Sequence, residues 1–576
     1  DIGKRSYKIP ANSKQVRMSD EMPQWIEADR SALNSLLVGG NKLVRIDTVP
    51  DDCPIGSCVT ARRLKVDQAN GELDKFKSRH AYDGKRMAAI RARLGLPPAP
   101  TGTCNIIDDC GLKCLFGDIA MRNRFFAKAD IGDAYMNGTR ARSVGFMRMP
   151  DTIKEYDDDG TEMVIMLVTP IWGETEAGFE WDLELHEGLL AMGWRQCPGV
   201  PAMYYFNTTD EHGNEHDCRL VKIVDDLGFS ESDSSQTITK RTVAMLTKRY
   251  GKMTHDLNPS SFAGYRVNIT RNATHTEVCL SQEQKVVEAA RKYLPELLDG
   301  ITPTQLLTGK QLEQALDNLA LPAERGSKLD GDQKMTQRII GDLKYFERGS
   351  MPRLTRMVHR LSCVMGFPPA SGLICAQSVL AVAYEHRHDT ITFGTINASS
   401  IRPPPQNGQL SECLSHGAPA QLECSADAAL APVIVYSILL TFAGASIAHV
   451  CKKIGTAVGS THDAENIATV KASELIVYAR VVLKALGVEP QVPTLLLTDN
   501  LSNQRVSHNA QSSARSRYYL MRSHCLHQRV TDGELAVVHI PDGENPSDFL
   551  TKFIPAEKTS KSVVYSSGTT TLANQP

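Results

Sequence analysis

Apolar residues recur along the chain in two patterns, one typical of strands and one typical of helices. Residues 59–80 contain two strand-like runs joined at Asn70-Gly71, a common hairpin turn, and a second hairpin is expected over 154–168. Residues 179–193 carry apolar side chains three and four positions apart, which predicts a helix, and 282–385 is mostly helical in pattern. Strands dominate the first half of the chain, and helices follow them.

The last third of the chain alternates strand-like and helical segments, which is typical of an α/β domain. It follows the proline-rich text "RPPPQNGQ" (402–409), which cannot continue a helix or a central strand and predicts a linker. The longest apolar stretch, residues 433–450, is interrupted by Gly and small polar residues. Two adjacent strands fit it better than a membrane helix.

Length and composition narrow the class of protein. A chain of 576 residues predicts three or four lobes, and a net charge of −2 argues against a uniformly basic surface for nucleic acid. The stretch from Thr60 to Arg93 is the most basic, and both a solvated hairpin and a phosphate-contacting surface explain it. Fourteen cysteines form no disulfide framework, and Cys104, Cys110 and Cys114 lack CxxC spacing. Reduced thiols and a zinc site both remain open.

Paired aspartates provide the first chemical signal. Asp225 and Asp226 end the strand-like run 220–224, whereas the doublets at 51–52, 108–109 and 157–159 lie in turn-like text. Two carboxylates at a strand end repel each other unless a cation neutralises them. Asp130 ends another such segment, so if the two strand ends meet, three carboxylates would bind two divalent cations. That arrangement is suited to phosphodiester chemistry.

These segments together resemble a known family. "ADIGDAYMNG" (129–138) followed by "IVDD" (223–226) resembles the palm of reverse transcriptases, and the surrounding text is similar to the Pol polyprotein of copia-type LTR retrotransposons. "KFKSRHAYDG" (75–84) resembles the fingers of that family, and residues 262–294 and 339–346 are similar to the segments beyond the palm. The resemblance runs from about Trp25 to Pro555.

The resemblance implies a multidomain α/β and α+β fold: a right-hand polymerase with fingers, palm, thumb and connection, followed by a ribonuclease H-like α/β domain. The implied divisions are an N-terminal remnant of a longer polyprotein (1–20), fingers and palm (21–275), thumb and connection (276–400), a linker (401–417), the ribonuclease H-like domain (418–556) and a disordered tail (557–576). The first residue is Asp rather than Met, which fits either a piece of a polyprotein or an incomplete gene model.

In the polymerase half, the resemblance implies that Asp130, Asp225 and Asp226 bind two Mg²⁺ ions, for which Mn²⁺ could substitute. Lys77 and Arg79 would contact the incoming triphosphate. Tyr135 would lie under the sugar and exclude a 2′-hydroxyl, although a core aromatic residue also explains it.

Four carboxylates in the second half resemble the ribonuclease H site, which also uses two Mg²⁺ ions: Asp427, Glu465, Asp499 and Asp548. Asp463 competes with Glu465 for the second role, and helical spacing favours Glu465. His539 either assists the reaction or is an ordinary structural histidine. Arg515, Arg517 and Arg522 lie among aromatic residues and are expected to follow the backbone of the hybrid.

The implied activity is RNA-directed DNA polymerase with ribonuclease H. Its partners would be an RNA template, a DNA primer, the RNA–DNA hybrid, dNTPs and other parts of the polyprotein, with no membrane, in a cytoplasmic particle or the nucleus. The family's polyprotein also serves DNA integration, but this chain has no protease or integrase site of its own. A palm-domain enzyme such as a nucleotidyl cyclase could use paired aspartates, but it would not explain the second acidic quartet.

The sequence departs from the family between the two palm motifs. Family members carry Lys, Gln and Arg where "GETEAGFEW" (173–181) has Thr175, Glu176 and Glu180, and Ile223 replaces a common aromatic residue. New carboxylates beside a polyanionic substrate would weaken binding. The alternative hypothesis is therefore a degenerate, inactive retroelement remnant that keeps the fold and binds nucleic acid.

Overall fold

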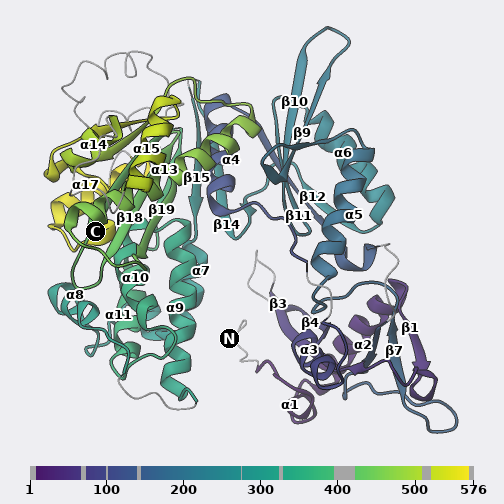
Figure 1. The fold of residues 1–576 in the computed structure, drawn as a ribbon. Helices are drawn as coiled ribbons and strands as arrows, with labels where there is room; N and C mark the ends of the chain where they lie inside the picture. The colour runs from purple at the N-terminus through teal and green to yellow at the C-terminus, as the bar shows by residue number, and fades with distance from the viewer. Residues whose placement is uncertain are drawn as a thin grey trace.

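The computed structural model describes residues 8–66, 73–98, 102–138, 145–273, 275–322, 328–394, 422–508 and 520–569. Figure 1 shows a mixed α/β molecule in which two sheet-containing lobes lie beside a helical bundle and a C-terminal α/β domain. We call these parts the N-terminal lobe, the central lobe, the helical bundle and the C-terminal domain. Within the described residues, no helix is both long and apolar enough to cross a bilayer.

The N-terminal lobe combines a four-stranded sheet with a separate hairpin. The sheet has the order β1-β7-β6-β2, and its strands are β1 (Lys42–Arg45), β2 (Ile55–Gly56), β6 (Gly145–Arg148) and β7 (Met163–Leu167). The expected hairpin over 59–80 forms from β3 (Cys58–Val66) and β4 (Leu73–Tyr82). The helices are α1 (Ser13–Arg17), α2 (Met22–Val38) and α3 (Gly84–Arg93), with the short 3-10 turn η1 (Ile46–Thr48).

The second expected hairpin, over 154–168, is reduced to one bridge between Tyr156 and Glu162. The turn itself forms, since the amide of Asp157 donates to Thr161 O and that of Met163 donates to Glu155 O, but β7 takes β1 and β6 as its sheet neighbours.

The central lobe is a six-stranded antiparallel sheet with the order β12-β5-β11-β10-β9-β8. Its strands are β5 (Phe125–Ile131), β8 (Arg195–Cys197), β9 (Val200–Thr209), β10 (Glu215–Ile223), β11 (Asp226–Glu231) and β12 (Met253–Asp256). Helices α5 (Ala177–Ala191) and α6 (Thr237–Tyr250) cover one face. Helix α5 confirms the helix predicted over 179–193. Helix α4 (Asp109–Arg122) covers part of the other face, and η2 (Ala134–Asn137) follows β5.

A small sheet and a helical bundle come next, in agreement with the helical pattern of 282–385. The sheet has the order β13-β14-β15-β16, from β13 (Ser261–Phe262), β14 (Tyr265–Arg271), β15 (Thr276–Ser281) and β16 (Thr390–Phe393). The bundle contains α7 (Glu283–Tyr293), η3 (Pro295–Asp299), α8 (Gly309–Asp317), α9 (Gly331–Gly349), η4 (Pro352–Leu354), α10 (Thr355–Val364) and α11 (Gly372–Glu385). Asp330 and Gln333 form a capping box at the start of α9.

The C-terminal domain is a five-stranded sheet with the order β19-β18-β17-β20-β21. The expected pair of strands over 433–450 is present as β18 (Val435–Phe442) and β19 (Ala445–Lys453), which pair antiparallel, and β18 also pairs antiparallel with β17 (Glu423–Ala429). Strands β20 (Thr494–Thr498) and β21 (Leu535–His539) run parallel to β17. The helices are α13 (Thr461–Leu486), α14 (Leu501–His508), α15 (Leu520–Thr531), α16 (Asp548–Thr551) and α17 (Ala556–Ser567), with the turn η7 (Asp542–Glu544).

The expectation of a disordered tail over 557–576 is wrong for its first half. Residues 556–567 form α17, in which Val563 is buried and the Tyr565 hydroxyl donates to Glu423. The small and β-branched residues of this segment gain stability from packing on the sheet rather than from helix propensity. The predicted linker, 401–417, lies outside the described residues.

Candidate functional sites

The central lobe brings the first predicted set of carboxylates to one edge of its sheet. Asp226 lies directly opposite Asp130 in the antiparallel pairing of β11 with β5, and Asp225 precedes it in the turn from β10. Along β5, Ala127, Ala129 and Ile131 face α5 and α6, so the alternation of a strand turns Asp130 to the opposite face. The three predicted side chains therefore gather at one place.

The turn that carries Asp225 is strained and is held from both sides. Val224 has φ of 61°, a conformation that a β-branched residue rarely adopts. The buried indole of Trp181 donates to the Val224 carbonyl at 2.9 Å, and the backbone amide of Ile131 donates to the Asp225 carbonyl at 3.2 Å. Backbone strain of this kind costs on the order of 1–3 kcal/mol and is concentrated at functional sites.

Burial and repulsion from neighbouring carboxylates favour the protonated forms of Asp225 and Asp226. Burial, followed by the charges of Asp225 and Asp130, raises the pKa of Asp226 to about 6, and Lys128 opposes the rise. The pKa of Asp225 is also raised, mainly by burial. Asp130 and Asp226 line a cleft of about 1110 Å³ that extends to β13, β14 and α7. A cation placed there would relieve the repulsion and restore the charged forms.

The candidate nucleotide-binding residues lie next to this edge. Arg79, on β4, places its guanidinium 5.2 Å from the centre of the Trp172 ring, and Trp172 packs edge-on against Tyr135 at 6.2 Å. The charge of Arg79 opposes the rise that burial causes in the pKa of Asp225, so the N-terminal lobe brings a cation to the carboxylates. Lys77 lies on the same strand, and its pKa is lowered by burial and by Arg79. Tyr135 is half-buried rather than a fully enclosed core residue.

The acidic substitutions lie differently from what the sequence suggested. Glu180 is only 7% exposed on α5, and Glu176 is half-buried at the N-cap of that helix. Thr175 is exposed. Gly173 keeps a structural role, because a Cβ there would lie 2.0 Å from the Tyr82 carbonyl oxygen and φ is +92°. Glu180 is thus enclosed by protein rather than presented to solvent.

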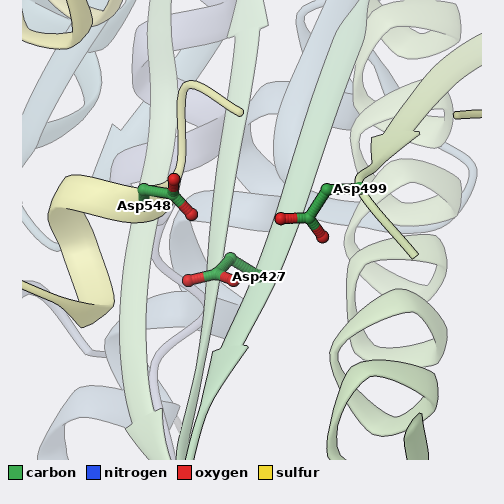
Figure 2. Close-up of side chains that lie close together, drawn as sticks. All are labelled: Asp427, Asp499 and Asp548. Atoms are coloured by element: carbon green, nitrogen blue, oxygen red, sulfur yellow. The ribbon is translucent and has the colours of Figure 1, made fainter. Parts of the chain in front are cut away.

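The C-terminal domain forms a compact acidic centre (Figure 2). Asp427 from β17, Asp499 after β20 and Asp548 at the start of α16 each offer an oxygen within 4.8 Å of the others. Within the described residues, no other set of three His, Cys, Asp or Glu ligand atoms is as close, and the central carboxylates lie further apart. Strand order explains the arrangement, because β17 and β20 are parallel neighbours and end at the same edge.

Glu465 joins this centre from α13. Its Oε1 accepts a hydrogen bond from the Ala428 amide at 3.2 Å, whereas its Oε2 is buried without a hydrogen-bond partner among the described residues. Burial, then Asp427 and Asp499, raises its pKa to about 9. The Asp463 carboxylate instead accepts from the Gly459 amide at 3.3 Å and pairs with Arg522 at 3.2 Å. The geometry therefore favours Glu465 over Asp463.

Two lysines at this centre were missed by the sequence analysis. Lys552 Nζ lies 3.0 Å from Asp427 and 3.4 Å from Asp548, and Lys558 pairs with Asp548. Burial and repulsion from Asp548 raise the pKa of Asp427, and Lys552 opposes the rise. The signal available in the sequence was the spacing of Lys552, four residues after Asp548 and one helical turn away.

The remaining predicted residues have mixed outcomes. The His539 Nε2 donates to the Asp499 carbonyl at 3.1 Å, so this histidine supports the loop after β20. Arg522 lies on α15, where it faces the start of α13 through Asp463. Arg515 and Arg517 lie outside the described residues.

Both centres fit divalent cations by their donor chemistry. Hard cations prefer carboxylate oxygens, and two ions need several of them. The orphaned Oε2 of Glu465 lies beside a cavity of about 430 Å³ that Asp499 also lines. A buried carboxylate oxygen without a hydrogen-bond partner in the protein fits the role of a metal ligand.

Comparison with known proteins confirms the resemblance. Homologues over 92% of the chain are retrovirus-related Pol polyproteins of Arabidopsis thaliana transposons: RE2, 24% identical over 537 residues, and RE1, 22% identical over 535. The chain spans about a third of the length of these relatives (33%). No family model matches. Among solved structures, ribonuclease H1 from Halobacterium salinarum is similar over 22% of this chain and 89% of its own, with 17% identity and a TM-score of 0.17.

Proposed function

We propose that this chain is an RNA-directed DNA polymerase with ribonuclease H activity, from the Pol region of a copia-type retrotransposon. The observation that carries the proposal is the pairing of Asp226 with Asp130 beside the turn of Asp225, in a chain homologous to Pol polyproteins. The acidic centre of the C-terminal domain is a second, independent support. In this assignment the N-terminal lobe is the fingers, the central lobe is the palm and the helical bundle is the thumb.

In the polymerase centre, Asp130, Asp225 and Asp226 would hold two Mg²⁺ ions, which activate the attacking hydroxyl and stabilise the leaving oxygen. Arg79 and Lys77 provide the positive charge that the triphosphate of an incoming dNTP needs. Trp172 limits the rotation of Tyr135, whose ring would lie under the sugar and exclude a 2′-hydroxyl. Trp181 holds the turn in place and thereby orients Asp225.

In the nuclease centre, Asp427, Glu465, Asp499 and Asp548 would hold two Mg²⁺ ions, where Mn²⁺ could substitute. Asp427 and Asp548 are buried and hydrogen-bonded, so their position is fixed before substrate arrives. Lys552 and Lys558 balance the charge of the carboxylates. The substrate would be the RNA strand of an RNA–DNA hybrid. The polymerase centre would produce this hybrid by extending a DNA primer along an RNA template.

The polymerase is tested by dNTP incorporation on oligo(dT)-primed poly(rA) with Mg²⁺ or Mn²⁺. We expect Asp225→Asn and Asp226→Asn each to reduce incorporation by at least about a hundredfold, since each removes a metal ligand. Asp158→Asn, an exposed aspartate in the 157–159 run, is the matched control and retains activity. A folded wild-type chain that binds the hybrid without incorporation would favour the degenerate remnant.

The nuclease is tested with a hybrid whose RNA strand carries a 5′ label. Glu465→Gln should lose at least about a hundredfold in cleavage, whereas Asp463→Asn, two residues away, should retain it. Equal losses in the two variants would show that the assignment of Glu465 is wrong.

A further inference from the structure

The C-terminal end of α9 lies where the palm, the helical bundle and the C-terminal domain meet. The last carbonyls of a helix have no partner within the helix, so other groups must satisfy them when the end is buried. At the end of α9, Phe346 O accepts from the backbone amides of Ser350 and Met351. The neighbouring carbonyls are satisfied by side chains from distant parts of the chain.

Side chains from three different segments bond to carbonyls at this end: those of Glu347 and Arg348 belong to the last four of the helix, and that of Tyr345 lies one residue before them. Gln282, before α7, donates to Tyr345 O at 3.2 Å. His449 Nε2, on β19 of the C-terminal domain, donates to Glu347 O. Lys113 Nζ, on α4 of the central lobe, donates to Arg348 O at 2.8 Å.

The capped end is buried and tightly packed. Lys113 is 1% exposed and His449 is 6% exposed, so each hydrogen bond replaces solvation that is no longer available. Gly349 permits the close approach of Gln282, because a Cβ at that position would lie 1.9 Å from Gln282 Oε1. The ammonium of Lys113 also faces the negative end of the helix dipole. Arg348 adds an ion pair to Asp109 at 2.6 Å.

The same bundle contacts both candidate centres. Helix α7 lines the cleft that contains Asp130 and Asp226. Helix α10 packs on β19 and on α16, the helix that begins at Asp548, and the Arg356 guanidinium lies 5.5 Å from the Phe553 ring. A change in the angle of α9 would therefore move one wall of each centre relative to the other.

We propose that Lys113 and His449 are positioning residues that fix the bundle against the palm and the C-terminal domain. In doing so they set the distance along a bound hybrid between polymerisation and RNA cleavage. The inference rests on the proposed function, because it assigns a shared substrate to the two centres. It assigns no chemical step to either residue.

The matched variants differ in whether the side chain keeps the hydrogen-bond donor that reaches the end of α9. His449→Gln places an amide N–H where Nε2 donates, and His449→Leu has no donor. Lys113→Met keeps the stem of the side chain and loses the ammonium. Arg338→Ala changes an exposed residue on the same helix and is the control.

The readout is the position of RNA cuts in a hybrid whose DNA primer ends at a fixed nucleotide. The full chain should cut at one main distance from the primer end. His449→Leu and Lys113→Met should spread or shift the cuts by several nucleotides. His449→Gln and Arg338→Ala should each keep the wild-type distance. Unchanged cut positions in both loss variants would overturn the proposal.

Amide hydrogen exchange on the full chain provides a readout that needs no activity. Each loss variant should exchange about tenfold faster or more at the end of α9 and also in α4 and β19, since the cap joins all three. Faster exchange confined to the substituted segment would overturn the proposal. A wild-type chain without either activity would refute the proposed function, while the exchange result would still decide whether the cap joins the three parts.

Discussion

At the residue scale, the two acidic centres balance their charge differently. Asp427 and Asp548 have Lys552 within 3.4 Å, so much of their repulsion is already offset by the chain. Within the part of the chain that the structure describes, no lysine forms an ion pair with Glu465, and burial raises its pKa to about 9 although the charge of Lys552 opposes the rise. Its ionisation therefore depends on a bound cation more strongly than that of its neighbours.

Metal binding at the C-terminal centre should depend on pH. The raised pKa of Glu465, about 9, means that the metal-free protein holds a proton there at neutral pH, which a metal must displace. We expect Mn²⁺ affinity to rise between pH 6 and pH 8, with the release of about one proton. Calorimetry in buffers of different ionisation enthalpy measures both quantities. Glu465→Gln should abolish most of the proton release, and an unchanged release would contradict this assignment.

The strained turn at Val224 gives a prediction about stability. Val224→Gly removes partly buried methyl groups but relieves a positive φ of 61°, so the net change should be within about 1 kcal/mol. Val221→Gly, at a fully buried position in regular β10, has no strain to relieve and should cost about 3 kcal/mol or more. Urea unfolding measures both variants. Equal losses in the two would show that the Val224 conformation stores no strain.

At the scale of elements, period and turn signals predicted most strands and helices but not their partners. The runs at 220–224 and 433–450 were correctly predicted as strands, and the position of Asp225 and Asp226 followed from the end of the first of them. Helix α17 was missed because its sequence has weak intrinsic helix propensity and its stability comes from tertiary contacts. Lys552 was missed for a related reason, since its role depends on a contact with Asp427 across 125 residues of sequence.

Helix α17 should be required for the stability of the C-terminal domain. Val563 packs with Leu439, Phe549 and Leu550, and Lys558 pairs with Asp548. A chain that ends at Pro555 should lose about 2–5 kcal/mol of stability and most nuclease activity, whereas a chain that ends at Thr569 should retain both. Thermal unfolding and hybrid cleavage test this. A stable, active chain without α17 would mean that its packing contributes little.

At the scale of the whole molecule, the parts share a core. One hydrophobic cluster contains Phe116 of α4, Met203 of β9, Leu440 of β18 and Leu483 of α13. Figure 1 shows α4 between the central sheet and the C-terminal domain. Arg122 and Arg219 both donate to Leu486 O, at 2.8 and 3.2 Å. Hydrophobic periodicity and residue spacing within one segment contain no information about this contact. The sequence therefore predicted the separate domains but not how they pack together.

The shared core predicts that the first 400 residues do not fold stably alone. Without the C-terminal domain, α4 loses the partner that covers it at Gly117, where a Cβ would lie 2.7 Å from the Phe442 ring, and the apolar face around this position is exposed. We expect residues 1–400 to bind a hydrophobic dye and aggregate, and co-expression with residues 401–576 to restore a soluble complex. Gly117→Asp in the first fragment should prevent this rescue, because its side chain would collide with Phe442, while Asp158→Asn should not. A monomeric, cooperatively unfolding 1–400 fragment would show that the polymerase half is an independent unit, and the cap on α9 would then join two bodies rather than brace one.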